Sequence, residues 1–115
     1  MVPETSSISE IRVYECTQFP LQWKYKMTLM KNVDASDSMI IRKNGFWFLL
    51  TNICSVKNGD HLSELHVFYS KNIFTTNWKP IRTGNPVILD SNKARNGGIY
   101  KHEGRLFRVS QFHKF

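Results

Sequence analysis

Apolar residues along this chain come in short runs that are separated by polar turn residues. Residues 64–70 (ELHVFYS) place apolar side chains at regular intervals among polar ones, and residues 10–16 follow a similar pattern. The longest apolar run, residues 46–50, has the length of a strand and is rich in aromatic side chains. This pattern predicts strands, and no long segment shows helical periodicity with caps.

Two further segments, residues 38–51 and 99–110, each hold two short strand-like runs around a turn. The turns read KNG and HEG and end at Gly45 and Gly104. Glycine accepts the positive φ that tight hairpin turns require. The sequence therefore predicts two β-hairpins, with separate strands at residues 64–70 and 10–16.

The chain contains an internal repeat. The segments that begin at Glu10 and Glu64 both open with Glu, an aliphatic residue, a polar residue, Val and an aromatic residue. Both then reach a Trp-Lys pair, at Trp23 and Trp78. The offset is 54 residues at the glutamates and 55 residues at the tryptophans, so the two segments are equivalent parts of one repeating unit.

A second pair of segments, residues 37–52 and 96–111, interleaves with the first at an offset of 59 residues. Each consists of a strand, a turn that ends in Gly, and another strand. The first six residues of the chain take the place of a preceding second strand, which sets Glu4 level with Asn52 and Gln111. The repeating unit is therefore four antiparallel strands.

Tandem four-stranded antiparallel units are the blades of β-propellers. We therefore predict an all-β fold, a partial propeller with one complete blade and two incomplete flanking blades. Residues 1–33 supply strands two to four of one blade, residues 34–83 the complete blade, and residues 84–115 the start of the next. In the complete blade the first strand starts near Asp37, and the fourth surrounds Trp78. A propeller closes only with at least four blades, so missing blades are expected partners.

Composition and charge narrow the range of partners. The 115 residues are 41% hydrophobic and 13% aromatic, which suits one folded domain. The net charge is +7, but the basic residues are spread along the chain, so we interpret them as a solvated surface and predict no nucleic-acid partner. No apolar stretch approaches the ~20 residues that span a membrane, and no signal-peptide pattern opens the chain.

The sequence contains no motif that is typical of a metal site, a cofactor site or a disulfide framework. Cys16 and Cys54 lie in or at the end of apolar runs, where we expect free thiols and hence a reducing compartment. The four histidines lack metal-ligand spacing. There is neither a phosphate-binding glycine loop nor a Ser-His-Asp pattern. We therefore predict no metal and no cofactor.

A set of motifs over residues 1–111 is shared with one known family. In chain order they read MVPETS, YECTQFPLQW, NVDASD with NGFWFLLTN, ELHVFYS, Trp-Lys-Pro, Gly-Asn-Pro, ARNGG and GRLFRVSQ. On these motifs the sequence resembles the N-terminal β-propeller domain of the glucosamine inositolphosphorylceramide transferase family. The resemblance implies bacterial relatives, some linked to sugar formyltransferase-like domains. The separate transferase domain of longer members is not present in this chain.

The resemblance also implies a fold and a site. It implies a five-bladed propeller like those of several glycoside hydrolase families, with a carbohydrate-facing central pocket. Family members usually carry an Arg shortly after the ARNGG stretch, where this chain has Ile99 and Tyr100. Any anion-binding role of that Arg is therefore lost here or taken over by Arg95.

Polar residues at the start of the first strand of each blade are candidate ligand contacts, because these strands line the central channel of a propeller. Asp37 and Asn96 begin such strands, Asp34 and Arg95 precede them, and we expect Asp37, Arg95 and Asn96 within roughly 10 Å of one another. Asp37 is the candidate catalytic residue. Glycosidases place two carboxylates about 5–9 Å apart, and Glu4 is a better partner for Asp37 than Asp34. Alternatively, Asp37 caps a turn or pairs with Arg95.

Polar residues at the end of apolar second strands form a further candidate group, made of Glu4, Asn52 and Gln111. Burial of such a residue is costly unless it is hydrogen-bonded. Two interpretations stay open: these side chains bond between blades, or they face the pocket. Arg108 is a further pocket candidate, whereas the recurring tryptophans are interpreted as structural.

Two functions stay open at this point. In the favoured one, the chain is the sugar-binding or sugar-processing propeller portion of a glycan-modifying transferase, associated with glycosyl or formyl transfer. Its substrate is then a carbohydrate or glycolipid, and the chain alone is not expected to be active. In the alternative, the propeller is a non-catalytic interaction module that binds a protein or polyanion. The low cysteine content favours a bacterial, cytoplasmic setting.

Overall fold

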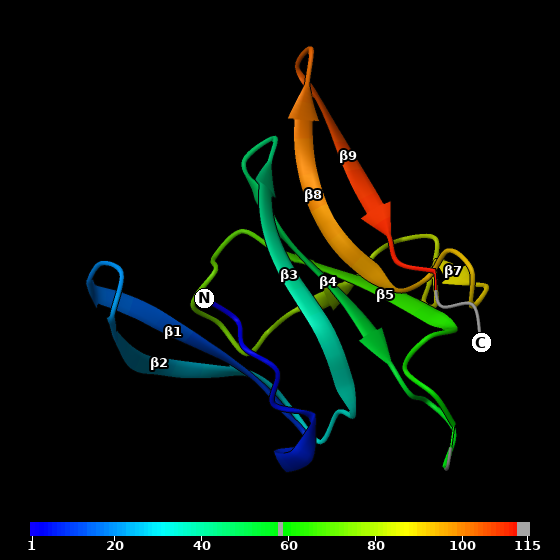
Figure 1. Cartoon of the computed structure of the whole chain (residues 1–115), viewed down its shortest axis with the longest axis horizontal. Helices are drawn as coiled ribbons and strands as arrows, with labels where there is room; N and C mark the ends of the chain where they lie inside the picture. Colours follow the sequence, from blue (N-terminus) through cyan, green and yellow to red (C-terminus); the bar gives the residue numbers. More distant parts are fainter. Residues whose placement is uncertain (58, 113–115) are drawn as a thin grey trace.

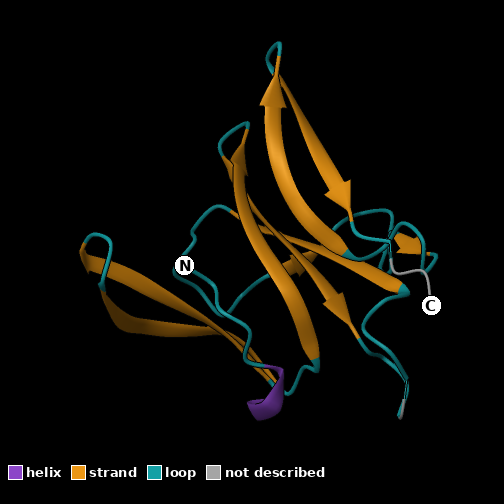
Figure 2. Ribbon diagram, viewed as in Figure 1, coloured by secondary structure: helices purple, strands orange, loops and turns teal. Residues whose placement is uncertain are grey.

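The computed structural model of the chain describes residues 1–57 and 59–112, and its elements are labelled in Figure 1. They are the 3₁₀ turn η1 (Ser6–Ile8) and the strands β1 (Glu10–Gln18), β2 (Gln22–Lys31), β3 (Ala35–Lys43), β4 (Phe46–Ile53), β5 (Glu64–Ser70), β6 (Lys79–Pro80), β7 (Ile88–Leu89), β8 (Asn96–His102) and β9 (Arg105–Ser110). The all-β prediction is confirmed: Figure 2 shows strands and loops throughout, apart from η1. Among the described residues no helix is long and apolar enough to cross a membrane.

The strands form three antiparallel sheets. The first is the hairpin β1–β2, the second has the order β3-β4-β5-β6, and the third is the hairpin β8–β9. The short strand β7 pairs with β5 in the middle sheet. In Figure 1, β3 and β8 run beside each other in the same direction, as equivalent strands of neighbouring units. The predicted hairpins and separate strands are all present, and the described residues form no closed ring.

The first residues of the chain lie along β1, as the repeat predicts. The N–H of Tyr14 donates to the carbonyl of Met1 at 2.8 Å, and the amino group of Met1 donates to the carbonyl of Tyr14 at 2.9 Å. In the middle sheet the equivalent pair is Leu49 with Phe68. The start of the chain therefore occupies the position that β4 has beside β5.

The fourth strand of the middle sheet is shorter than the sequence suggests. Only β6, Lys79–Pro80, follows Trp78. Pro80 has no backbone N–H to donate, which interrupts the ladder. The side chain of Asn85 replaces part of the missing strand, because its Oδ1 accepts from the N–H of Val67 at 2.8 Å and its Nδ2 donates to the carbonyl of Val67 at 3.0 Å. The edge of β5 is thus covered by β6, Asn85 and β7 together.

Two hydrophobic clusters lie between the sheets. The cluster between the first and middle sheets contains Ile11 and Ala35, which are 2% and 4% exposed. The cluster between the middle and third sheets contains Leu65 and Ala94, at the positions 54 and 59 residues further along. A small residue at the start of β3 or before β8 thus lies beside a large aliphatic residue of the preceding unit. The two interfaces are built on the same plan.

The tryptophans differ in their surroundings. Trp78 is buried in the cluster between the first and middle sheets, and Trp47 packs against the same cluster. Trp23, the counterpart of Trp78 in the repeat, is 38% exposed on β2. The structural interpretation therefore fits Trp78 and Trp47 closely, while Trp23 presents part of its ring at the surface.

Candidate functional site

The strands β3 and β8 begin with the same irregularity. In β3, Asp37 and Ser38 together oppose the single residue Thr51 of β4. In β8, Gly97 is the extra residue and follows Asn96. Such bulges redirect side chains and are common beside binding sites. Asp37 has φ of 48°, in the left-handed region that few non-glycine residues adopt, so the bulge holds it in a strained conformation.

The bulges bring three of the predicted site residues into contact. Nε of Arg95 donates to Oδ2 of Asp37 at 2.7 Å. Nδ2 of Asn96 donates to the carbonyl oxygen of Asp37 at 3.0 Å. The side chains of Arg95 and Asp37 are 27% and 26% exposed, so this ion pair is reachable from solvent. The middle and third sheets thus each contribute one charged group to a polar surface at their joint start.

The second candidate group joins neighbouring sheets. Oδ1 of Asn52 accepts from the N–H of Asn96 at 2.9 Å, and its Nδ2 donates to the carbonyl of Ala94 at 2.8 Å. Oε2 of Glu4 accepts from the N–H of Asp37 at 3.2 Å, which is the equivalent bond one unit earlier. Asn52 is fully buried. The sequence left open whether these side chains bond between units or face the pocket. Glu4 and Asn52 both form hydrogen bonds between units.

Gln111 and Arg108 support the same region from β9 and the residues beside it. Nε2 of Gln111 donates to the carbonyl of Asn96 at 2.7 Å, within its own hairpin. Nη1 of Arg108 donates to the carbonyl of Ala94 at 3.2 Å and to Oδ1 of Asn96 at 3.2 Å. Nη2 of Arg108 donates to the carbonyl of Lys93. Burial lowers the pKa of Arg108. These side chains hold the backbone that presents Arg95.

Asp34 lies outside this cluster of contacts. Its Oδ1 is 2.6 Å from Nε2 of His61, and half of its side chain is exposed. The sequence grouped Asp34 with Asp37 because the two are three residues apart, but β3 starts between them and the bulge turns Asp37 toward the third sheet. The contact with His61 joins residues 27 positions apart, on either side of the β3–β4 hairpin, and has no local sequence signal.

The arrangement suits ligand positioning more directly than proton transfer. The carboxylate of Asp37 already accepts from Arg95, and Glu4 already accepts from the N–H groups of Asp37 and Ser6. A carboxylate beside a guanidinium can accept from sugar hydroxyls, and the guanidinium can bind an anionic group. Within residues 1–57 and 59–112, no group of three or more His, Cys, Asp or Glu side chains is arranged to hold a metal ion.

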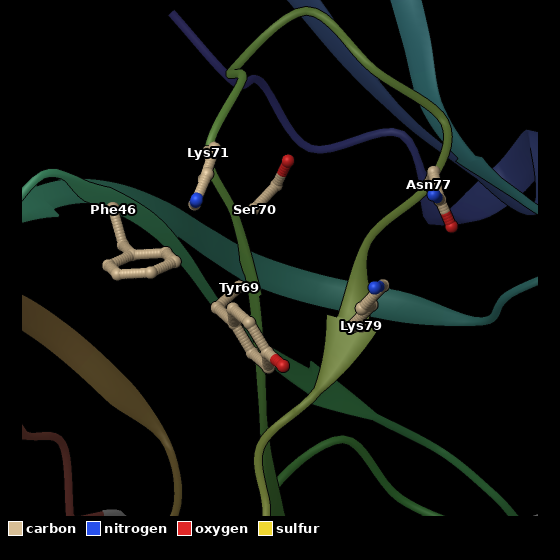
Figure 3. Close-up of a pocket in the computed structure, with 6 residues that line it drawn as sticks. All are labelled: Phe46, Tyr69, Ser70, Lys71, Asn77 and Lys79. Carbon is tan, nitrogen blue, oxygen red and sulfur yellow. The ribbon is translucent and has the colours of Figure 1, made fainter.

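A hollow that the sequence did not indicate lies at the other end of the middle sheet. Figure 3 shows its side chains, and its volume is about 510 Å³. The rings of Phe46 and Tyr69 meet edge to face with centroids 5.9 Å apart, and Nζ of Lys71 lies 5.8 Å from the centroid of Phe46. The lining residues are Phe46, Tyr69, Ser70, Lys71, Asn77 and Lys79. The only sequence signal is that Phe46 and Tyr69 fall on one face of paired strands.

Comparison with known proteins places the chain in a family. The family model described as glucosamine inositolphosphorylceramide transferase 1, N-terminal, matches residues 1–114. Proteins named glucosamine inositolphosphorylceramide transferase 1 from Arabidopsis thaliana and from Oryza sativa subsp. japonica are 33% and 30% identical to it. Each match covers 96% of this chain but only 14% and 15% of the relative. No solved structure matches the chain.

These relatives are plant proteins, whereas the bacterial relatives that the sequence led us to expect stay a prediction. The matched region is the one that carries the motifs, the repeated interfaces and the Asp37–Arg95 ion pair. The chain belongs to the glucosamine inositolphosphorylceramide transferase family, in which it corresponds to the N-terminal domain.

Proposed function

We propose that this chain is the sugar-recognising part of a glycan-modifying transferase, and that the Asp37–Arg95 ion pair contacts the sugar substrate. One observation carries the proposal. A partly exposed carboxylate and guanidinium, 2.7 Å apart, are supplied by two neighbouring sheets and held in place from behind by the buried amide of Asn52 and the partly buried guanidinium of Arg108. A site that is rigid and polar, and that remains open to solvent, suits recognition of a polyhydroxylated ligand.

The names of the relatives suggest the chemical class of the ligand. Inositolphosphorylceramide carries a phosphodiester next to a ring of hydroxyl groups. Arg95 supplies a cation for such a phosphate, and the carboxylate of Asp37 accepts from neighbouring hydroxyls. The substrate class is therefore an acidic glycolipid headgroup or the sugar that is transferred to it.

The propeller architecture is part of the same proposal. The contacts that recur from the first interface to the second support it: the bonds of Glu4 and Asn52, and the small residues Ala35 and Ala94. We propose five blades, of which residues 1–33, 34–83 and 84–115 supply an incomplete, a complete and a further incomplete one. The remaining blades and the transferase domain would then come from a longer protein.

The test is a titration of the labelled chain followed by NMR. Inositol phosphate and glucosamine are added in turn, and the amide signals of Asp37, Arg95 and Asn96 are expected to shift in a saturable way. Asp37→Asn keeps the size of the side chain and removes its charge, so affinity should fall at least about tenfold. Asp34→Asn is the matched control and should bind like the parent chain. Absence of saturable shifts, or an equal loss in both variants, would refute the site.

The alternative function is a non-catalytic module for a protein or polyanion. The basic, aromatic hollow around Phe46 and Lys71 favours it, because this hollow is remote in the sheet from Asp37 and contains no carboxylate. Binding of heparin by the chain, unchanged in Asp37→Asn and without any response to sugars, would favour this alternative.

A cytoplasmic setting also belongs to the proposal. Cys16 and Cys54 are both free thiols in the structure, which agrees with a reducing compartment. Alkylation of the protein in freshly lysed cells, before any reductant is added, should modify both cysteines. Recovery of oxidised thiols from the cell would contradict this setting.

A further inference from the structure

The two ends of the sheets differ in charge. We call residues 15–26, 42–46, 69–82 and 101–106, which form the turns between paired strands and the strand ends beside them, the hairpin end. It holds nine basic and two acidic residues, a net charge of +7. The other described residues hold six basic and seven acidic ones, a net charge of −1. Figure 1 shows the turns of β1–β2, β3–β4 and β8–β9 along one side of the molecule.

The basic residues of the hairpin end are mostly not neutralised. Among the described residues, Lys43, Lys71 and Lys101 make no ion pair with a carboxylate, and Lys26 pairs with Glu15 at 3.3 Å. At the opposite end three of the six described basic residues, Arg12, Lys93 and Arg95, have a close acidic partner. The net positive charge of the described residues is therefore gathered on one surface.

Several of these basic side chains are grouped around hollows in the surface and are not scattered singly. Between the β3–β4 and β8–β9 turns lies a hollow of about 360 Å³, lined by Arg42, Lys43, Asn44, Lys101, Gly104 and Leu106. The hollow of Figure 3 adds Lys71, beside the ring of Phe46, and Lys79, on the other side of Tyr69. Neither lining contains a carboxylate. Cations from separate sheets thus leave room for anionic groups between them.

Apolar side chains project from the same surface. At the β1–β2 turn, Phe19 is 83% exposed and Leu21 is 87% exposed. Trp23 and Tyr25 follow on β2 with exposures of 38% and 48%. Phe74, the counterpart of Phe19 in the repeat, remains 43% exposed although Nζ of Lys26 in the neighbouring sheet lies 5.1 Å from its ring centroid. Exposed apolar turns are thus a property of this end even where a neighbouring sheet is present.

We propose that the hairpin end is a docking surface for an anionic lipid bilayer. Phe19 and Leu21 enter the interfacial region, Trp23 and Tyr25 lie at headgroup level, and the lysines bind lipid phosphates. A bilayer uses both the charge and the apolar tips, whereas a soluble polyanion without an apolar face, such as heparin, leaves Phe19 and Leu21 without a partner. This docking is independent of sugar recognition at the Asp37–Arg95 ion pair, which lies at the opposite ends of the same strands.

The experiment is co-sedimentation of the full chain with vesicles. Vesicles of phosphatidylcholine and phosphatidylglycerol should bind the chain, with a blue shift of tryptophan fluorescence, and vesicles of phosphatidylcholine alone should bind it far more weakly. Each basic residue near an anionic surface contributes about fivefold to binding. The double variant Lys43→Glu with Lys101→Glu should therefore bind at least about tenfold more weakly.

Two further variants make the result specific. Phe19→Ser with Leu21→Ser replaces exposed side chains and should also weaken binding at least about tenfold, because it removes the inserted apolar area. The matched control Lys31→Glu with Lys57→Glu makes the same charge change at the opposite end and should bind like the parent. Asp37→Asn should keep vesicle binding, which separates this result from the sugar site.

Three outcomes would overturn the docking surface. They are no preference for the anionic vesicles, an equal loss in the control variant, and binding that survives Phe19→Ser with Leu21→Ser and is displaced by heparin. The last outcome would assign the basic surface to a soluble polyanion instead of a membrane.

Discussion

Replacing Asn52 with alanine removes one of the side chains that join the middle and third sheets. Asn52 is fully buried, and its amide makes three bonds. Nδ2 donates to the carbonyls of Glu64 at 3.0 Å and Ala94 at 2.8 Å, and Oδ1 accepts from the N–H of Asn96 at 2.9 Å. Two of these bonds cross between sheets, so the variant tests the interface rather than a single strand.

The expected cost follows from what each bond leaves behind. The N–H of Asn96, in a residue that is 2% exposed, loses its acceptor and stays buried, which costs about 1–3 kcal/mol. The carbonyl of Ala94 keeps a donor, Nη1 of Arg108 at 3.2 Å. Loss of the two hydrogen bonds that Nδ2 of Asn52 donates, to Ala94 and to Glu64, therefore costs about 0.5–1.5 kcal/mol each. The free energy of unfolding should fall by about 2–6 kcal/mol in total, a large part of the ~5–15 kcal/mol typical of a domain.

Urea unfolding followed by circular dichroism measures this change, because the signal reports on all strands. The control is Asn77→Ala, since Asn77 is exposed and no described residue bonds to its side chain. The control should change the free energy of unfolding by less than about 0.5 kcal/mol. A loss below about 1 kcal/mol for Asn52→Ala would show that these bonds do not hold the sheets together, since it would fall short of one unsatisfied group.

Two other predictions concern acid stability and packing. The hydroxyl and N–H of Ser55 donate to Glu64 and lower its pKa, so Glu64 stabilises the fold above its unfolded pKa of about 4.3 and this contribution is lost as pH falls through the lower folded value. Glu64→Gln should therefore flatten the loss of urea stability in that acid range, and an unchanged pH profile would contradict this. Leu65→Ala, at a site 2% exposed against Ala94, should cost about 2–5 kcal/mol in the same assay. Leu89→Ala, at 72% exposure, should cost less than about 0.5 kcal/mol, and similar losses for the two would refute the packing.

The strands and hairpins were predictable because their signals are local. Alternation set the positions of β1 and β5, and Gly45 and Gly104, with φ of 79° and 75°, marked the two turns. The short fourth strand was not predictable, because nothing local shows that the side chain of Asn85, rather than backbone, completes the edge of β5. A side chain that replaces the backbone hydrogen bonds of a strand leaves no periodic pattern in the sequence.

The repeat explains why much of the candidate site was predictable. The offset of 59 residues set Asp37 and Asn96 at the same position in neighbouring units, and the structure places them in contact. The pair of Asp34 with His61 was missed, because it depends on the path of a long loop. The burial of Ala35 and Ala94 was missed as well, because a small residue reveals a close approach between sheets only once the sheets are placed.

The concentration of positive charge at the hairpin end could not be predicted from the sequence either. Along the chain the basic residues look evenly scattered, which led to the interpretation of a solvated surface. In sheets of antiparallel strands, however, every second connection returns to the same end. Basic residues that are far apart in sequence, such as Lys43 and Lys101, therefore line one hollow.

The paired roles of Glu4 and Asn52 have a consequence for how such units diverge. One is a carboxylate and the other an amide, yet each places an oxygen at the N–H of the residue that opens the next unit's bulge. What the interface requires there is an acceptor atom at that N–H, and not a given amino acid. Successive units can therefore lose their sequence similarity while the sheets keep the same spacing. Equivalent units are better recognised by the positions of their hydrogen-bond acceptors than by residue identity.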